Sequence, residues 1–136
     1  RGSGYGPDDF DTAREWGFHV IQAEELWYKS CVPLMEKIRK NIGPKPVYLT
    51  FDIDSLDPAC APGTGTVEAG GLMTHQGLEI VRGCKGLNLV GCDLVEVSPP
   101  YDSSGNTATI AANLLYEMLC VLPGVPYGKM RQLYKK

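Results

Sequence analysis

The chain has 136 residues, which is enough for one hydrophobic core and too few for two comfortable domains. Its composition of 43% hydrophobic and 21% charged residues is that of a globular domain and argues against a disordered chain. No apolar run approaches the ~20 residues of a membrane span, and the net charge of −3 comes without a Lys/Arg cluster. We therefore expect neither a membrane nor a nucleic acid as a partner.

The N-terminal region is predicted to form a loop followed by two short elements. Residues 1–11 are rich in Gly, Ser, Pro and Asp. Their Gly-x-Gly-x-Gly spacing has no strand before it and no Lys-Ser/Thr after it, so it does not predict a phosphate-binding loop. A short helical turn is predicted at 11–14 and a short strand at 18–22.

Three longer segments have the apolar spacing of helices. The first begins at Glu24 and ends at a Gly-Pro stop signal, and Pro33 can kink it or divide it in two. The second is expected at 75–82, with Thr74 as its N-terminal cap. The third is expected at 108–122, where the apolar residues form one stripe.

Two apolar segments are predicted to be buried parallel strands. Residues 47–51 lead straight into Asp52 and Asp54, and residues 87–97 end with Glu96 shortly before two prolines. Both segments are apolar on both faces, which favours interior strands of a parallel sheet. Strands that alternate with helices form βαβ units, so the predicted fold class is α/β, with about three strands and flanking helices.

Acidic residues gather where the two predicted strands end. In an extended backbone the side chains of Asp52 and Asp54 leave the same face, and parallel pairing brings Glu96 to the same edge, where open α/β sheets bind ligands. Carboxylate pairs suit oxygen-loving cations such as Mn²⁺ or Mg²⁺. Three converging acids are costly without a compensating charge, so the pattern predicts a metal ion and a cationic substrate.

Other chemistries have weaker support. A Mg²⁺-dependent phosphotransferase that used the same two aspartates would need a phosphate-binding loop, which the sequence does not predict. His19 and His75 lie outside any metal-ligand spacing, and Ser55 and Ser98 lack the Gly-x-Ser-x-Gly setting of an acyl-transfer triad. The irregular segment 57–74 is long for a compact domain, and such segments are usually functional.

Five cysteines are scattered along the chain without a Cys-x-x-Cys pair. An odd and unpatterned set predicts reduced, mostly buried thiols and an intracellular location. These cysteines are Cys31, Cys60, Cys84, Cys92 and Cys120.

Two blocks of sequence carry a resemblance to a known family. Residues 50–63, Thr-Phe-Asp-Ile-Asp-Ser-Leu-Asp-Pro-Ala-Cys-Ala-Pro-Gly, together with the Gly-Gly-Leu of 70–72, resemble a signature block of the ureohydrolases, the arginase and agmatinase family. Residues 91–102, Gly-Cys-Asp-Leu-Val-Glu-Val-Ser-Pro-Pro-Tyr-Asp, are similar to the agmatinase branch. The resemblance implies that residues 1–136 are the C-terminal part of a single ureohydrolase domain, with part of the three-layer, parallel-sheet arginase-like fold.

The resemblance also implies a centre of two Mn²⁺ ions. Asp52 is expected to bridge both ions and Asp54 to bind one of them. Glu96 is expected beside the guanidinium group of the substrate, and Thr66 in the active-site loop. A hydroxide between the two metals would hydrolyse an agmatine-like guanidino compound to urea and an amine. No further residue of the chain is assigned a catalytic role.

The resemblance has implications for partners and location as well. Agmatinases act in polyamine biosynthesis, in mitochondria or in the cytoplasm, and family members are commonly homo-oligomers. Residues 124–136 are predicted to be a tail or an arm that contacts another subunit. Agmatine, guanidinobutyrate and related compounds present the same guanidinium group, so the sequence leaves the choice among them open.

The chain departs from the family pattern in its loop and in what it lacks. Val67 stands where the family usually has Pro, and residues 73–75 interrupt a usual Gly-Gly-Leu-Thr. The family's remaining ligands lie in Gly-Gly-Asp-His and Asp-Ala-His-x-Asp segments, which these 136 residues do not contain. Two carboxylates cannot fill two coordination spheres of about six ligands each. Two hypotheses follow: part of a manganese-dependent amidinohydrolase, or a non-catalytic, truncated homologue that acts as a structural or interaction protein.

Overall fold

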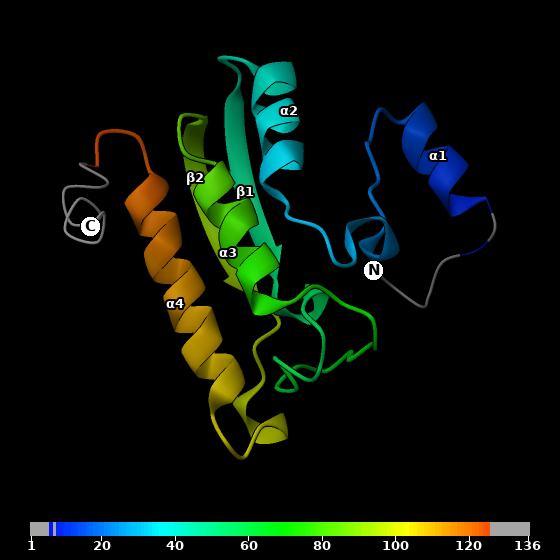
Figure 1. The fold of residues 1–136 in the computed structure, drawn as a ribbon, viewed down its shortest axis with the longest axis vertical. Coiled ribbons are helices and arrows are strands. Elements are labelled where there is room, and N and C mark those ends of the chain that lie inside the picture. The colour runs from blue at the N-terminus through cyan, green and yellow to red at the C-terminus, as the bar shows by residue number, and fades with distance from the viewer. Residues whose placement is uncertain (1–5, 7, 126–136) are drawn as a thin grey trace.

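The computed structural model describes residue 6 and residues 8–125, which form an α/β arrangement of helices around a small parallel sheet (Figure 1). Most of the loop predicted before residue 8 and of the tail predicted after residue 123 lies outside the described residues. The elements in chain order are α1 (Asp9–Glu15), the 3-10 turn η1 (Ala23–Leu26), α2 (Val32–Ile42), β1 (Pro46–Asp52), the 3-10 turn η2 (Ile53–Ser55), α3 (Thr74–Gly83), β2 (Asn88–Val95), the 3-10 turn η3 (Pro99–Tyr101) and α4 (Asn106–Val121).

The two strands pair in parallel, with α3 in the connection between them. Their register runs from Pro46 opposite Asn88 to Asp52 opposite Val95, with one irregularity after Val47. The predicted α/β class and the predicted parallel pairing are therefore confirmed. Because both strands end at the same edge, the residues that follow Asp52 and Val95 leave the sheet side by side.

The third predicted strand, at 18–22, is wrong: these residues have no regular secondary structure, and the sheet of the described chain has two strands. A strand needs a neighbour that satisfies its backbone N–H and C=O groups, and local propensity does not reveal whether one is within reach. The apolar side chains of this segment instead line a hollow against α2, together with Leu34 and Ile38.

The helices begin and end close to where their sequences predict. Pro33 divides the first predicted helix, and it lies in the first turn of α2, where its missing N–H costs no hydrogen bond. The N-terminal cap of α3 is Met73 rather than Thr74, because the Gln76 side chain reaches back and accepts a hydrogen bond from the Met73 N–H at 2.9 Å. Helix α4 begins at Asn106, two residues before the predicted start of 108, and ends at Val121.

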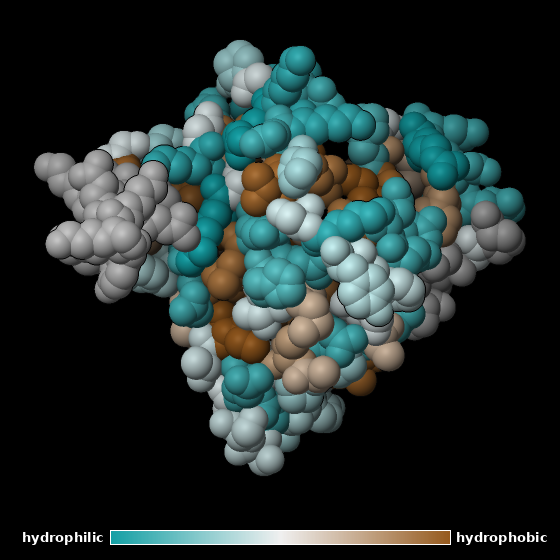
Figure 2. Space-filling model, viewed as in Figure 1, coloured by the Kyte–Doolittle hydropathy of each residue, from teal (hydrophilic) through white to brown (hydrophobic). Residues whose placement is uncertain are grey.

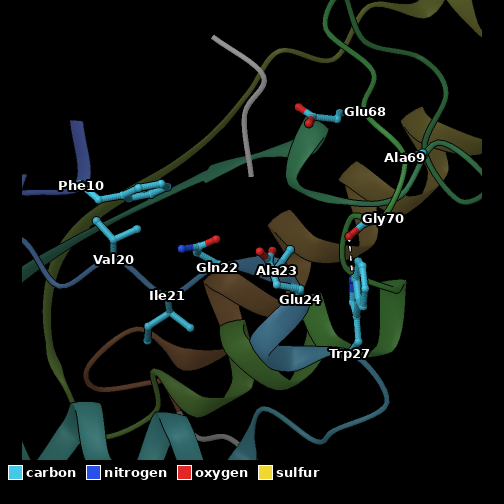
Figure 3. Close-up of a pocket in the computed structure, with 10 residues that line it drawn as sticks. All are labelled: Phe10, Val20, Ile21, Gln22, Ala23, Glu24, Trp27, Glu68, Ala69 and Gly70. Atoms are coloured by element: carbon cyan, nitrogen blue, oxygen red, sulfur yellow. Dashed lines mark hydrogen bonds between the residues drawn. The ribbon is translucent and has the colours of Figure 1, made fainter. Parts of the chain in front are cut away.

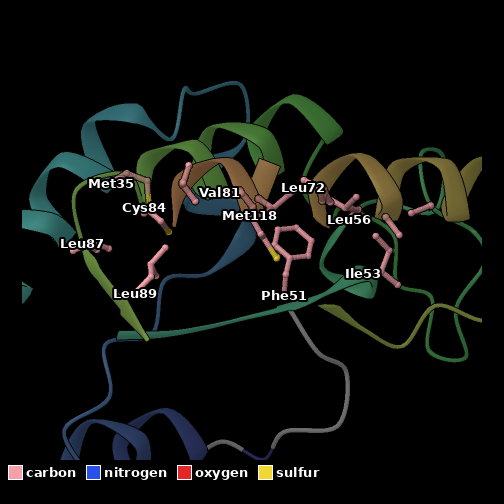
Figure 4. Packing of buried hydrophobic residues seen from close by; sticks show 14 residues of the cluster. Met35, Phe51, Ile53, Leu56, Leu72, Val81, Cys84, Leu87, Leu89 and Met118 are labelled. Atoms are coloured by element: carbon pink, nitrogen blue, oxygen red, sulfur yellow. The ribbon is translucent and has the colours of Figure 1, made fainter. Parts of the chain in front are cut away.

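Helices α2, α3 and α4 cover one face of the sheet and bury the hydrophobic core against it (Figures 1 and 4). Helices α2 and α3 approach closely, since a Cβ atom on Gly83 would lie 2.5 Å from the Cβ of Met35. Arg82 of α3 and Glu117 of α4 form an ion pair across the helix interface. The largest fully buried apolar side chains of the core are those of Ile53, Leu56, Val81, Leu114 and Met118.

The opposite face of the sheet is open in the described chain. Tyr48 is 60% exposed and Val90 is 66% exposed, so the prediction that the strands are buried on both faces is wrong for this chain. The reason is that α2, α3 and α4 all lie on one side. Apolar patches also interrupt the hydrophilic surface in Figure 2, and the outward side of α4 exposes Leu115 and Leu119. No helix among residues 8–125 is long and apolar enough to cross a lipid bilayer.

The core packing predicts unequal effects of two neighbouring substitutions in α4. Leu114 is fully buried, so Leu114→Ala is expected to lower the free energy of unfolding by about 2–5 kcal/mol through the cavity that it leaves. Leu115 is 42% exposed, and Leu115→Ala should change the same quantity by about 0.5 kcal/mol or less. Urea unfolding followed by circular dichroism measures both, and equal losses would contradict this packing.

Candidate functional site

The two aspartates of the predicted metal site lie on a turn that ends β1. The strand ends at Asp52, and η2 carries Asp54. The Asp54 N–H donates a hydrogen bond to Asp52 Oδ1 at 3.1 Å, and Ser55 Oγ donates one to the Asp52 carbonyl oxygen at 2.7 Å. The expectation that an extended backbone aligns the two carboxylates is thus wrong, because the backbone leaves the extended conformation after Asp52. A 3-10 turn brings the two residues together instead.

The electrostatics of this turn indicate a shortage of positive charge. Burial raises the pKa of Asp52, and the negative charges of Asp54 and Glu96 raise it further, against a lowering contribution from the Asp54 N–H. The structure therefore brings Asp54 and Glu96 close enough for their charges to act on Asp52. Within the described ranges, however, no three His, Cys, Asp or Glu side chains form a group that could hold a metal ion.

Glu96 has an unusual backbone conformation. It directly follows β2 and has φ of 66°, in the left-handed region that residues other than glycine rarely adopt. Such a conformation costs of order 1–3 kcal/mol and is found most often at functional sites, where the surrounding structure holds it. At Glu96 the chain turns away from the sheet, and two residues later the Ser98 N–H donates to the carbonyl oxygen of Gly63 at 2.7 Å.

The irregular segment after η2 is a compact loop with closed ends, hereafter the 57–72 loop. The Asp57 N–H donates to the Leu72 carbonyl oxygen at 2.8 Å, and the Leu72 N–H donates to that of Ser55 at 2.8 Å. The Asp57 carboxylate also accepts a hydrogen bond from the Gly70 N–H at 2.8 Å. A Cβ atom on Gly71 would lie 2.6 Å from the Asp57 nitrogen, so only glycine allows this closure. The predicted long irregular segment is confirmed.

Thr66 lies in the 57–72 loop and contacts the aspartate turn directly. Its Oγ1 donates a hydrogen bond to Asp54 Oδ2 at 2.7 Å. A contact of this kind helps to orient the Asp54 carboxylate. The predicted role of Thr66 in substrate binding stays a prediction, whereas its contact with Asp54 is a feature of the structure.

Two residues that the sequence reasoning missed tie the 57–72 loop to α4. The Asp102 carboxylate accepts hydrogen bonds from the Ser104 hydroxyl at 2.6 Å and from the Thr107 N–H at 2.6 Å. Thr107 Oγ1 in turn accepts one from the Gly63 N–H at 2.8 Å. The available signal was an Asp a few residues before a helix start, followed by Ser, Gly and Asn, which is typical of a turn that caps a helix.

The histidines and cysteines lie apart from the acids. His19 lines the hollow beside α2, and His75 lines a second one with Trp27, so neither joins the predicted site. All five cysteines are free, as expected of reduced thiols, but only Cys31 and Cys84 are buried. Burial raises the pKa of Cys84 to about 11, which keeps its thiol protonated and unreactive.

A third hollow, of 240 Å³, borders the 57–72 loop (Figure 3). Trp27 stands at its side and donates a hydrogen bond from Nε1 to the Gly70 carbonyl oxygen at 2.9 Å. Glu68 also lines it, two residues along the loop from Thr66. The four predicted site residues are not among its lining residues, so this hollow is a neighbour of the acidic turn and not its cavity.

Comparison with known proteins identifies the family. The family model described as "Arginase family" matches residues 1–120. The chain belongs to the arginase family. The predicted ureohydrolase resemblance is therefore confirmed, together with its nearness to agmatinases, and the two-stranded sheet with its helices is part of the arginase-like fold.

Similar proteins of this family include guanidino-compound hydrolases by name. The chain is 65% identical to a guanidinobutyrase of Pseudomonas aeruginosa, over 92% of the chain and 39% of the relative. It is 64% identical to a mitochondrial agmatinase of Gallus gallus, over 92% of the chain and 37% of the relative. The solved structure of proclavaminate amidino hydrolase from Streptomyces clavuligerus matches with a TM-score of 0.80 and 41% identity, over 88% of this chain and 40% of that one. The chain thus spans less than half the length of the relatives it matches.

The hydrogen bonds on Asp102 predict a pH-dependent stability. The Ser104 hydroxyl and the Thr107 N–H and hydroxyl hold the pKa of Asp102 well below its ordinary value. In the unfolded chain this pKa is about 3.9, so the stabilisation is complete above that value and is lost progressively as the pH falls from there toward the lower pKa of the folded state. Urea unfolding should therefore give a larger difference between the wild type and Asp102→Asn at about pH 7 than at about pH 3. The exposed Glu36→Gln serves as the matched control, and a difference for Asp102→Asn that does not shrink in acid would contradict the prediction.

Proposed function

We propose that this chain supplies part of the active site of a manganese-dependent amidinohydrolase, which hydrolyses an agmatine-like guanidino compound to urea and an amine. The observation that carries the proposal is the convergence of Asp52, Asp54 and Glu96 at the carboxyl ends of the two parallel strands. The names of the guanidinobutyrase and agmatinase relatives support the same class of reaction.

The donor set of the aspartate turn fits manganese. Carboxylate oxygens are hard ligands that Mn²⁺ accepts. Burial and then the charges of Asp54 and Glu96 raise the pKa of Asp52, and a bound cation would offset both effects. Asp52 and Asp54 would be ligands of the metal centre, and the Thr66 hydroxyl would hold the Asp54 carboxylate in orientation. When bound, such ions supply Lewis-acid activation of the attacking water. The relatives extend well beyond the length of this chain, and we expect the remaining ligands to come from a region of that kind.

Glu96 is the residue that we propose to bind the guanidinium group. A carboxylate and a planar guanidinium form two parallel, charge-assisted hydrogen bonds, which fix the plane of the substrate. Glu96 directly follows Val95, which pairs with Asp52, so Glu96 lies at the same edge of the sheet as Asp52. Its backbone has the left-handed conformation at that point. The guanidinium is common to agmatine and guanidinobutyrate, so Glu96 recognises the class of substrate and leaves the choice within it to other residues.

We also propose that the protein works as a homo-oligomer inside the cell, in mitochondria or in the cytoplasm. The exposed apolar residues on the outward side of α4, Leu115 and Leu119, support a surface that another subunit covers. The name of the Gallus gallus relative, a mitochondrial agmatinase, supports a mitochondrial location.

The proposal predicts separate effects of two substitutions on metal and on turnover. The complete protein, in which this chain is joined to the region that supplies the remaining ligands, is expected to release urea from agmatine or guanidinobutyrate when it is loaded with Mn²⁺. Glu96→Gln should lower kcat/KM by about 100-fold or more with bound manganese unchanged, because it loses only the contact with the substrate. Asp54→Asn should lower bound manganese, measured by atomic absorption, together with turnover.

The exposed Glu36→Gln is the control for loss of one negative charge and should match the wild type in both measurements. Full turnover in Glu96→Gln would contradict the role of Glu96. No manganese above background and no urea release from that complete, unchanged protein would overturn the proposed function of this chain and favour the non-catalytic alternative.

A further inference from the structure

We infer that Asp102 and Thr107 are positioning residues that fix Thr66 and Glu96 relative to the aspartate turn. They join three parts of the chain at one buried point, Gly63: the start of α4, the 57–72 loop and the segment after Glu96. The contact network stands on its own, and only its consequence for the substrate rests on the proposed function.

The first part of this junction is the start of α4. The N-terminal cap position is Gly105, which has no side chain to accept a hydrogen bond from the first turn. Asp102 takes over this task, since its Oδ2 accepts the Thr107 N–H at 2.6 Å while its Oδ1 accepts the Ser104 N–H at 3.0 Å. A carboxylate at the positive end of a helix is also favoured by the helix dipole. Asp102 therefore holds Thr107 in one orientation.

The second part is the contact from Thr107 to the loop. Thr107 is 1% exposed, and its Oγ1 accepts the Gly63 N–H at 2.8 Å. The carbonyl oxygen of Gly63 accepts the Ser98 N–H, so both backbone groups of Gly63 are bonded, one to α4 and one to the segment after Glu96. A Cβ atom on Gly63 would lie 2.8 Å from the Cβ of Asp102. Contacts this tight leave no room for one part to shift alone.

The third part is the segment after Glu96, and both it and the 57–72 loop connect Gly63 to the site over a few residues. In one direction the loop continues to Thr66, whose hydroxyl contacts Asp54. Through the hydrogen bond from the Ser98 N–H, Gly63 is also linked to the segment after β2. Ser98 lies two residues after Glu96, whose backbone is in the left-handed conformation. The hydrogen bonds to Gly63 therefore restrain both Thr66, which contacts Asp54, and Glu96, which we propose to bind the substrate. Loss of the Thr107 acceptor should release the loop while the sheet stays intact.

Hydrogen–deuterium exchange of the whole chain, with three variants, tests the junction without reference to activity. Thr107→Val keeps the shape of the side chain but removes the acceptor, and it should raise amide exchange in the 57–72 loop by about tenfold or more, with β1 and α3 unchanged. Thr107→Ser keeps the hydroxyl and should restore the protection. Thr109→Val removes a hydroxyl that bonds only within α4, to the Gly105 carbonyl oxygen, and should match the wild type. Unchanged loop exchange in Thr107→Val, or an equal rise throughout the chain, would overturn the inference.

A kinetic measurement then tests the consequence for the substrate. In manganese-loaded protein that releases urea, Thr107→Val should raise KM about tenfold with kcat nearly unchanged, and Thr107→Ser should recover the wild-type KM. An unchanged KM alongside a released loop would overturn the positioning role. If the wild-type protein releases no urea, the proposed function fails, and the exchange result alone decides whether the junction exists.

Discussion

The parallel pairing of β1 and β2 is the constraint on which the candidate site depends. It sets Asp52 opposite Val95, so that the aspartate turn and Glu96 emerge from the sheet at one edge although they are far apart in sequence. Burial raises the pKa of Asp52, and the neighbouring charges of Asp54 and Glu96 raise it further, so a nearby positive charge would be favourable. A divalent metal and a guanidinium group are both cations, and each offsets part of that charge. The gathering of carboxylates that would bind these cations therefore follows from the register of the two strands.

The remaining structure holds the groups at this edge in place. Hydrogen bonds of Asp57 join the two ends of the 57–72 loop. Asp102 and Thr107 attach the loop to α4 through the hydrogen bond between Thr107 and Gly63. Neither contact touches the metal or the substrate in the proposed mechanism. They restrain Thr66 and, through Ser98, the segment after Glu96. A loop without regular secondary structure can thus carry functional groups as reliably as a helix or a strand when its own backbone groups are bonded.

The sequence predicted what depends on local pattern and on short-range chemistry. The strand before Asp52, the helices at 74–83 and 106–121 and the irregular loop all follow from apolar periodicity and from Gly and Pro.

Prediction failed where the outcome depends on distant neighbours. The segment at 18–22 has strand-like residues but no partner strand among the residues that the structure describes. The cap of α3 is Met73 because the Gln76 side chain bonds to the Met73 N–H. The junction at Gly63 was missed because a hydrogen bond between residues 63 and 107 leaves no periodic trace in the sequence.

The central claim is that the aspartate turn binds manganese through Asp52 and Asp54 while Glu96 stays free for the guanidinium group. Anomalous diffraction at the manganese edge, from crystals of the manganese-loaded protein, tests this most directly. We predict anomalous peaks within bonding distance of the carboxylates of Asp52 and Asp54, and none at Glu96. Peaks that are bound by Glu96, or that lie away from the aspartate turn, would contradict the account.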